Sequence, residues 1–230
     1  MAERPVFQVI ESGPELVQCP PVQFEWFPGM ALTQARKSIQ SLHAAAQRTV
    51  HIDRILEIST KSPDPLGVSL SAFNLTITTP RTQQGYSVES AFQASKVFEQ
   101  GGPYVDLLRA TSRDAKTDPR LSESGKLQSF RFYDQVWSLE PKTAFYDWLY
   151  LNALNRRPEL SARVCDYSAF TDIAFNPQRS INCQARSAAL FVALSVRNLL
   201  QSALAHRESF LNIVSLTPVT AVQSPALPFD

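Results

Sequence analysis

Apolar and polar residues follow one another along the chain with two spacings, one typical of amphipathic helices and one typical of short strands. The strand spacing predicts strands at residues 22–27, 55–60, 66–78 and 130–137. The helical spacing predicts helices at residues 33–48, 87–101, 105–116, 140–154 and 181–205. Thr33 and Ser87 are the expected N-caps of the first two helices, and Gly101 is the expected end of the second. In the first strand, Val22, Phe24 and Trp26 are expected to lie on one face.

The predicted helix 87–101 has an unusually narrow polar face. On a helical wheel, Glu89, Gln93, Lys96 and Gln100 fall within an arc of about 60°, and mostly apolar residues occupy the rest. One interpretation is a narrow solvated edge with its lysine in water. The other is a buried wall that holds an acid and an amine together. In such a wall, burial raises the pKa of a carboxyl group and lowers the pKa of a lysine, which favours proton transfer and nucleophilic attack.

The length and composition indicate one folded unit. The chain has 230 residues, of which 44% are hydrophobic, and it shows no internal repeat or linker between two cores. We predict a single helix-rich α+β domain with a small sheet at residues 22–214. An extended N-terminal arm at residues 1–21 precedes it, and an irregular tail at residues 215–230 follows it.

Charge and composition exclude several classes of function. The formal net charge is +1, which is not typical of a protein that neutralises many phosphates of a nucleic acid, but permits one that binds a single nucleotide in a pocket. The three histidines are not spaced as metal ligands, so we expect no metal and no cofactor. The three cysteines are widely spaced and predict reduced thiols.

The chain lacks several familiar local signatures. It contains no phosphate-binding loop, no dinucleotide-binding glycine motif and no nucleophile elbow of the Gly-x-Ser-x-Gly type. It has neither an N-terminal apolar run typical of a signal peptide nor a stretch long enough to span a bilayer. We therefore expect a cytoplasmic protein with no membrane association.

Other polar residues lie in apolar surroundings, and each has a simpler structural interpretation. Asn74 follows Phe73 and could cap the end of a strand, and Asp172 could cap the turn that follows it. Arg113 and Lys116 lie on a charged helix, where a solvated face is the ordinary expectation. The turn 101–104 could offer backbone amides to a phosphate, although two glycines after a helix need no ligand to explain them.

Several segments together resemble a known family. The segment VESAFQASKVF resembles the Glu-x-x-x-Gln-Ala-x-Lys signature of the NADAR (YbiA-like) proteins, and LSAFN and SRDAK resemble its upstream and downstream elements. Within that family, the chain resembles the stand-alone antitoxins encoded beside DarT-type DNA ADP-ribosyltransferase toxins. The supporting segments are RPVF, FEWFPG, KSIQSLHAAA, GGPYVDLL, LEPKTAFYDWLYLNAL and SINCQARSAALFVAL.

The resemblance implies a YbiA-like fold and an N-glycosidic hydrolase that removes ADP-ribose from the amino group of guanine in DNA. It implies that Glu89 moves protons and that Lys96 attacks the ribose to form a Schiff base, with Lys116 as the alternative amine. It implies that ADP-ribose is bound by the following residues: Phe73, Asn74, Gln93, Gly102, Tyr104, Arg113, Lys116, Asp172 and Asn182. Among these, Asn74, Gln93 and Asp172 are expected to contact ribose and base, and Arg113 or Lys116 with the turn 101–104 to contact the pyrophosphate.

Two other functions remain open at this point. One is an N-glycosidase that acts on a ribosylated small-molecule intermediate, and the other is a non-catalytic antitoxin that binds ADP-ribose or its toxin. The antitoxin-type N-terminal half, from Arg4 to about Lys61, favours the DNA substrate over the small molecule. The presence of both Glu89 and Lys96 favours an enzyme over a pure binding protein.

Overall fold

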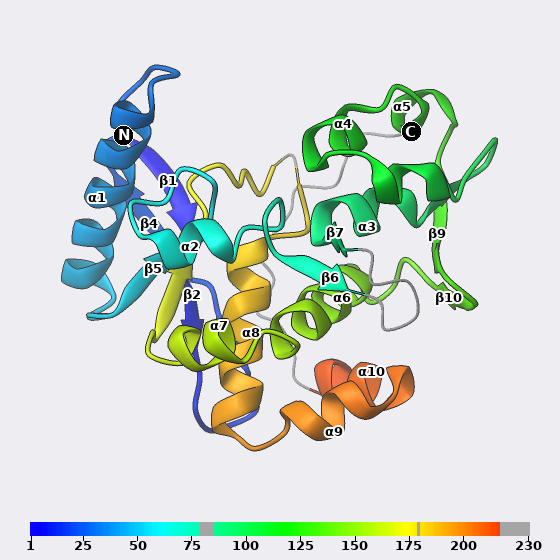
Figure 1. The fold of residues 1–230 in the computed structure, drawn as a ribbon. Helices are drawn as coiled ribbons and strands as arrows, with labels where there is room; N and C mark the ends of the chain where they lie inside the picture. The colour runs from blue at the N-terminus through cyan, green and yellow to red at the C-terminus, as the bar shows by residue number, and fades with distance from the viewer. Residues whose placement is uncertain (79–84, 179, 217–230) are drawn as a thin grey trace.

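The computed structural model describes residues 1–78, 85–178 and 180–216, which form short strands and helices in mixed order (Figure 1). The strands are β1 (Ala2–Pro5), β2 (Phe7–Val9), β3 (Val17–Gln18), β4 (Pro21–Phe24), β5 (Ile55–Glu57), β6 (Thr76–Thr78), β7 (Gly85–Ser87), β8 (Lys96–Phe98), β9 (Leu127–Phe132), β10 (Gln135–Trp137) and β11 (Ala169–Thr171). The helices are α1 (Leu32–Thr49), α2 (Pro65–Ser69), α3 (Val88–Ala94), the 3-10 helix η1 (Val105–Arg109), α4 (Ser112–Thr117), α5 (Arg120–Glu123), α6 (Ala144–Asn155), α7 (Pro158–Val164), α8 (Gln184–Val196), α9 (Leu200–Ala205) and α10 (Arg207–Leu216).

The largest sheet joins distant parts of the chain. Its strand order is β3-β2-β11-β5, with β2 and β11 antiparallel and β11 and β5 parallel. Phe170 of β11 pairs with Phe7 on one side and Leu56 on the other. The other sheets are a β1–β4 pair, a β6–β7 pair and a three-stranded sheet of order β10-β9-β8. The first 21 residues, predicted as an extended arm, contribute strands to two of these sheets.

Helices cover the largest sheet and continue the core beyond it. Helix α1 packs its buried face, which includes Ile39 and Leu42, against Val22 and Phe24 of β4. Helix α8 lies beside β2 and β11 (Figure 1). Helices α6 and α8 are buried on nearly all sides, and the sequence of α6 is correspondingly apolar around the whole helix.

A buried ion pair joins α6 to α8. The Asp147 carboxylate accepts hydrogen bonds from the Arg186 guanidinium and, at 2.6 Å, from the Ser187 hydroxyl. Because both charges are satisfied inside the protein, the pair fixes how the two helices align, whereas loss of one partner would leave a buried charge unpaired.

The α+β class that the sequence predicted is confirmed, although the structure contains several small sheets instead of one. The predicted strand 66–78 is wrong over its first part. Asp64 caps a short helix there, with its Oδ1 accepting a hydrogen bond from the Leu66 amide at 2.8 Å, and Pro65 occupies the first turn. Only Thr76–Thr78 is a strand.

Three predicted elements are each divided into two in the structure. The predicted helix 105–116 is η1 followed by α4, which Thr111 caps. The predicted helix 181–205 is divided into α8 and α9, with Asn198 between them at a φ of 57°. The predicted strand 130–137 is a hairpin of β9 and β10.

The predictions for Trp26 and Thr33 are also wrong, and most of the predicted tail lies outside the described residues. Trp26 follows β4 and is 40% exposed, and helix α1 is preceded by Ala31 with no side-chain cap from Thr33. Helix α10 extends to Leu216, and the rest of the predicted tail lies outside the described residues. No helix in the described parts of the chain is long and apolar enough to cross a membrane.

Candidate active site

Helix α3 holds the predicted acid, Glu89, in a buried position. Ser87 caps it as predicted, because its hydroxyl accepts a hydrogen bond from the Ser90 amide at 3.0 Å. All seven residues of the helix are buried, with α6 on one side and η1 and α4 on the other. The polar stripe is therefore an interior wall over the length of the helix, and Glu89 is only 6% exposed.

The helix is shorter than the sequence predicted. It ends at Ala94, and the Ser95 carbonyl accepts a hydrogen bond from the Arg131 amide at 2.7 Å. Lys96 begins strand β8 and pairs with Phe130 of β9. The prediction of a helix up to Gly101 was wrong because pairing with β9 takes over the backbone after Ser95. Lys96 therefore does not lie on the helix that carries Glu89, although the charge of Glu89 acts on its amine.

Glu89 has two close polar neighbours. Its Oε1 accepts a hydrogen bond from Gln93 Nε2 at 2.9 Å, as expected for residues one turn apart. The same oxygen is 3.8 Å from Lys116 Nζ, whose side chain is 56% exposed. Gln93 Oε1 is buried and has no hydrogen-bond partner among the described residues. Helix α3 therefore carries, side by side in the protein interior, the oriented carboxylate of Glu89 and the unsatisfied amide oxygen of Gln93.

Lys96 is half-buried beside this group. Its Nζ lies 5.0 Å from the centre of the Phe92 ring. Burial lowers its pKa below the usual lysine value, the charge of Glu89 opposes this, and the charge of Lys116 adds to it. Lys116 itself lies over the ring of Phe73, at 5.3 Å from its centre. Two lysines in different surroundings thus approach one carboxylate.

Tyr146 is a neighbour that the sequence pattern did not single out. It is buried on α6, and its ring meets Phe92 edge to face at 5.1 Å. Burial, and then the charge of Glu89, raise its pKa well above the usual tyrosine value. Its phenol therefore stays protonated and can donate a hydrogen bond. No spacing rule identifies it, because α6 is apolar on all sides.

Asp172 is tied to the Glu89 region through Gln184. Asp172 Oδ2 accepts a hydrogen bond from Gln184 Nε2 at 2.9 Å, and Gln184 Oε1 accepts one from the Ala72 amide at 2.7 Å. The Ala72 carbonyl in turn accepts the Glu89 amide at 3.0 Å. Asp172 also caps the turn that follows it, as the simpler interpretation expected, through the amides of Ala174 and Phe175.

The pKa of Asp172 is raised to about 7 by burial and then by the charge of Glu57. Glu57 is buried too, and its pKa is raised by burial. Its carboxylate accepts hydrogen bonds from the Thr171 hydroxyl at 2.6 Å and the Ile173 amide at 2.9 Å. His43 contacts the same Thr171 hydroxyl, and burial lowers its pKa to about 4. The buried network of Glu57, Thr171 and His43 thus lies close to Asp172 and acts on its carboxyl group through the charge of Glu57.

The turn 101–104, which follows strand β8, packs against the backbone of Lys96. Gly102 has a φ of +84°, and a Cβ built there would lie 2.2 Å from the Lys96 carbonyl oxygen. Tyr104 is directed elsewhere, because its hydroxyl bonds to Ser124 and its ring lies under the Arg120 guanidinium at 4.5 Å. Gly102 thus lies directly against the backbone of Lys96, whereas Tyr104 packs between Ser124 and Arg120.

The remaining predicted residues are less closely connected to Glu89. Asn74 is exposed, and its Nδ2 donates to the Val68 carbonyl at 2.9 Å within a local turn. Arg113 is exposed on α4, three residues before Lys116. Asn182 lies just before α8, and its Oδ1 is buried without a partner among the described residues. Within the described ranges, no group of three His, Cys, Asp or Glu residues is placed to hold a metal ion.

The fold and this site define a NADAR-type α+β protein with an interior glutamate flanked by two lysines. The family described as DarT1-associated NADAR antitoxin matches residues 2–224. The chain belongs to that family. A comparison with curated proteins gave no match.

Proposed function

We propose that this protein removes ADP-ribose from the exocyclic amino group of guanine in DNA, and so reverses the modification made by a DarT1-type toxin. The family supports the role of an antitoxin. The observation that carries the proposal is the interior carboxylate of Glu89, which contacts Lys116 and lies near Lys96, whose pKa is lowered. This combination suits the chemistry of an amino-linked ribose.

The ribose C1 that carries the guanine nitrogen is bonded to both nitrogen and oxygen, so its ring can open. Opening breaks the bond from C1 to the ring oxygen, the oxygen gains a proton from Glu89, and C1 forms a protonated imine with the guanine nitrogen, which keeps its hydrogen. Neutral Nζ of Lys96 then adds to C1. A proton moves from Nζ to the guanine nitrogen, the bond between that nitrogen and C1 breaks, and guanine leaves with its amino group restored.

The product of this step is a Schiff base between C1 and Lys96. Water adds to it, and ADP-ribose leaves with a free aldehyde while Lys96 regains its amine. Glu89 carries the protons in both halves of the reaction. Its oxygen is already oriented by Gln93 and Lys116. Lys116, which is more exposed, contacts the Glu89 carboxylate and helps to hold its position during the reaction.

The surrounding residues have binding roles in this proposal. The unsatisfied Gln93 Oε1 is available to accept a hydrogen bond from a substrate hydroxyl or amine. Asp172, held by Gln184, contacts ribose hydroxyls, and Phe73 contributes an apolar surface beside Lys116. Lys116 and the neighbouring Arg113 carry the positive charge nearest to α3 on this helix and are the candidates for pyrophosphate.

The test is to incubate the protein with guanine-ADP-ribosylated and thymine-ADP-ribosylated DNA and to measure the released ADP-ribose by mass spectrometry. We expect release from the guanine adduct, with the unmodified base restored in the DNA. Release from neither adduct, together with tight binding of ADP-ribose, would favour the non-catalytic antitoxin. Release from a ribosylated small molecule alone would favour the glycosidase of small molecules.

A further inference from the structure

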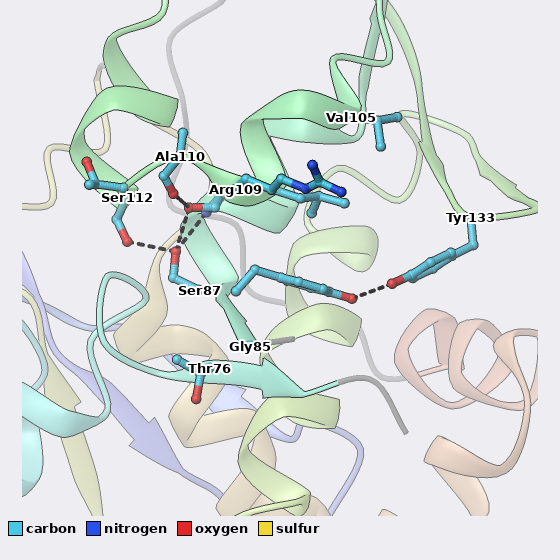
Figure 2. A pocket seen from close by; sticks show the side chains of 12 residues that line it. Thr76, Gly85, Ser87, Val105, Arg109, Ala110, Ser112 and Tyr133 are labelled. Carbon is cyan, nitrogen blue, oxygen red and sulfur yellow. Dashed lines mark hydrogen bonds between the residues drawn. The ribbon is translucent and has the colours of Figure 1, made fainter. Parts of the chain in front are cut away.

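A cavity of about 560 Å³ lies beside α3 but takes in neither Glu89 nor Lys96 (Figure 2). Its walls come from the β6–β7 pair, from η1 and the start of α4, and from the β9–β10 turn. The volume falls within the range of sites that hold a small organic ligand. We call it the Arg109 cavity, because Arg109 is the one charged residue among the described residues that line it.

The charge of this cavity suits an anion. Its described lining contains no acidic residue, and within the described chain the Arg109 guanidinium has no ion pair or hydrogen bond. The nearby acid on η1, Asp106, is already paired with Arg120 at 2.7 Å. An exposed guanidinium without a partner suits a phosphate, because its planar donors match phosphate oxygens.

The cavity also has an aromatic wall. The hydroxyls of Tyr86 and Tyr133 are hydrogen-bonded at 2.9 Å, and Arg109 and Tyr133 line the same cavity (Figure 2). Tyr86 is buried, whereas Tyr133 is 60% exposed at a turn where its φ is 51°. An exposed ring and a cation on the walls of one cavity can bind the base and the phosphate of single-stranded nucleic acid.

The cavity and the candidate active site share a wall. Ser112 lines the cavity, and its hydroxyl donates to Ser87, the cap of α3, at 2.7 Å. Ser112 begins α4, and Lys116 lies one turn further on, about 6 Å along the helix axis. Lys116 reaches Glu89. Helix α4 therefore contributes one residue to the wall of the cavity and another to the contact with Glu89.

We propose that the Arg109 cavity receives the nucleotide next to the modified guanine on the same DNA strand, with its phosphate at Arg109 and its base against Tyr133. This inference rests on the proposed function. The adenosine half of ADP-ribose has the same phosphate-and-base chemistry. The neighbouring nucleotide is favoured because two lining side chains, Val105 and Tyr133, are more than half exposed, which lets a strand continue past the cavity.

The experiment compares two substrates, a guanine-ADP-ribosylated oligonucleotide and ADP-ribosylated dGMP, which has no neighbouring nucleotide. Arg109→Gln and Tyr133→Ala should each raise KM for the oligonucleotide about tenfold and leave kcat unchanged. Neither should change KM for the mononucleotide. Tyr133→Phe keeps the ring and should behave as wild type. Arg36→Gln, which removes an exposed charge on α1, is the matched control.

Two outcomes overturn the proposal. An equal rise in KM for both substrates would assign the cavity to ADP-ribose, and wild-type KM for both would leave it without a part in binding. If the wild-type protein releases ADP-ribose from neither substrate, the proposed function fails, and the cavity is tested by fluorescence anisotropy with an unmodified single-stranded oligonucleotide. Weaker, less salt-dependent binding by Arg109→Gln then supports the cavity, and unchanged binding overturns it.

Discussion

Substitution of Gly102 by alanine tests whether the turn 101–104, after strand β8, sets the position of Lys96. The new Cβ would lie 2.2 Å from the Lys96 carbonyl oxygen, against ordinary contacts of at least 3.4 Å, so the two segments must separate. The φ of +84° adds strain, because alanine in this region costs about 1–2 kcal/mol. The crowding adds roughly 1–3 kcal/mol. Together, the backbone strain and the crowding should lower Tm by an amount on the order of 10 °C.

The effect on rate follows from the displacement. A shift of about 1 Å in a reacting group can cost about 100-fold in rate, and we expect a loss of that order in kcat. Gly13→Ala is the matched control, because Gly13 has a φ of +93° but nothing within 4 Å of its Cβ position. It carries the backbone strain without the contact, and should lower Tm by less and leave the rate unchanged.

The assay is release of ADP-ribose per folded molecule, with Tm measured by calorimetry. Wild-type turnover in Gly102→Ala would show that Lys96 does not depend on this contact. An equal loss of rate in Gly13→Ala would show that the effect comes from general destabilisation. Either result would contradict a positioning role of Gly102.

Two further predictions concern the charges at the candidate site. Glu89→Gln keeps the size of the side chain but removes proton transfer, so kcat should fall by about 10²–10⁴ with little change in Tm; turnover at the wild-type rate would exclude Glu89 from proton transfer. Lys116→Met removes a charge that lowers the pKa of Lys96, so that pKa should rise and the acidic limb of the kcat/KM profile should move to higher pH. A shift to lower pH, or the same shift in the exposed-lysine control Lys126→Met, would contradict it.

The sequence predicted those features that depend on local patterns. Glu89 and Gln93 contact each other because residues four apart meet on any helix, and Ser87 caps α3 because its hydroxyl precedes an apolar run. The burial of α6 followed from its sequence, which is apolar nearly all round. These predictions need no knowledge of distant segments.

What the sequence could not predict depends on contacts between distant segments. Helix α3 stops before Lys96 because β9, more than 30 residues later, supplies the next backbone partner. Gln184 joins Asp172 to Ala72, which lies 112 residues before Gln184, and the place of Gln184 at the start of an apolar helix gives no sign of that role. Tyr146 is similarly hidden in a helix without a polar face. Tertiary packing decides all three.

The most direct test of the account is to trap the covalent intermediate. Borohydride added during turnover of guanine-ADP-ribosylated DNA should reduce the Schiff base and leave ADP-ribose attached to a lysine, which peptide mass spectrometry can identify. We predict an adduct on Lys96, and its absence in Lys96→Arg, which cannot supply a neutral amine. An adduct on Lys116, or full turnover by Lys96→Arg without any adduct, would contradict the assignment of Lys96 as the nucleophile.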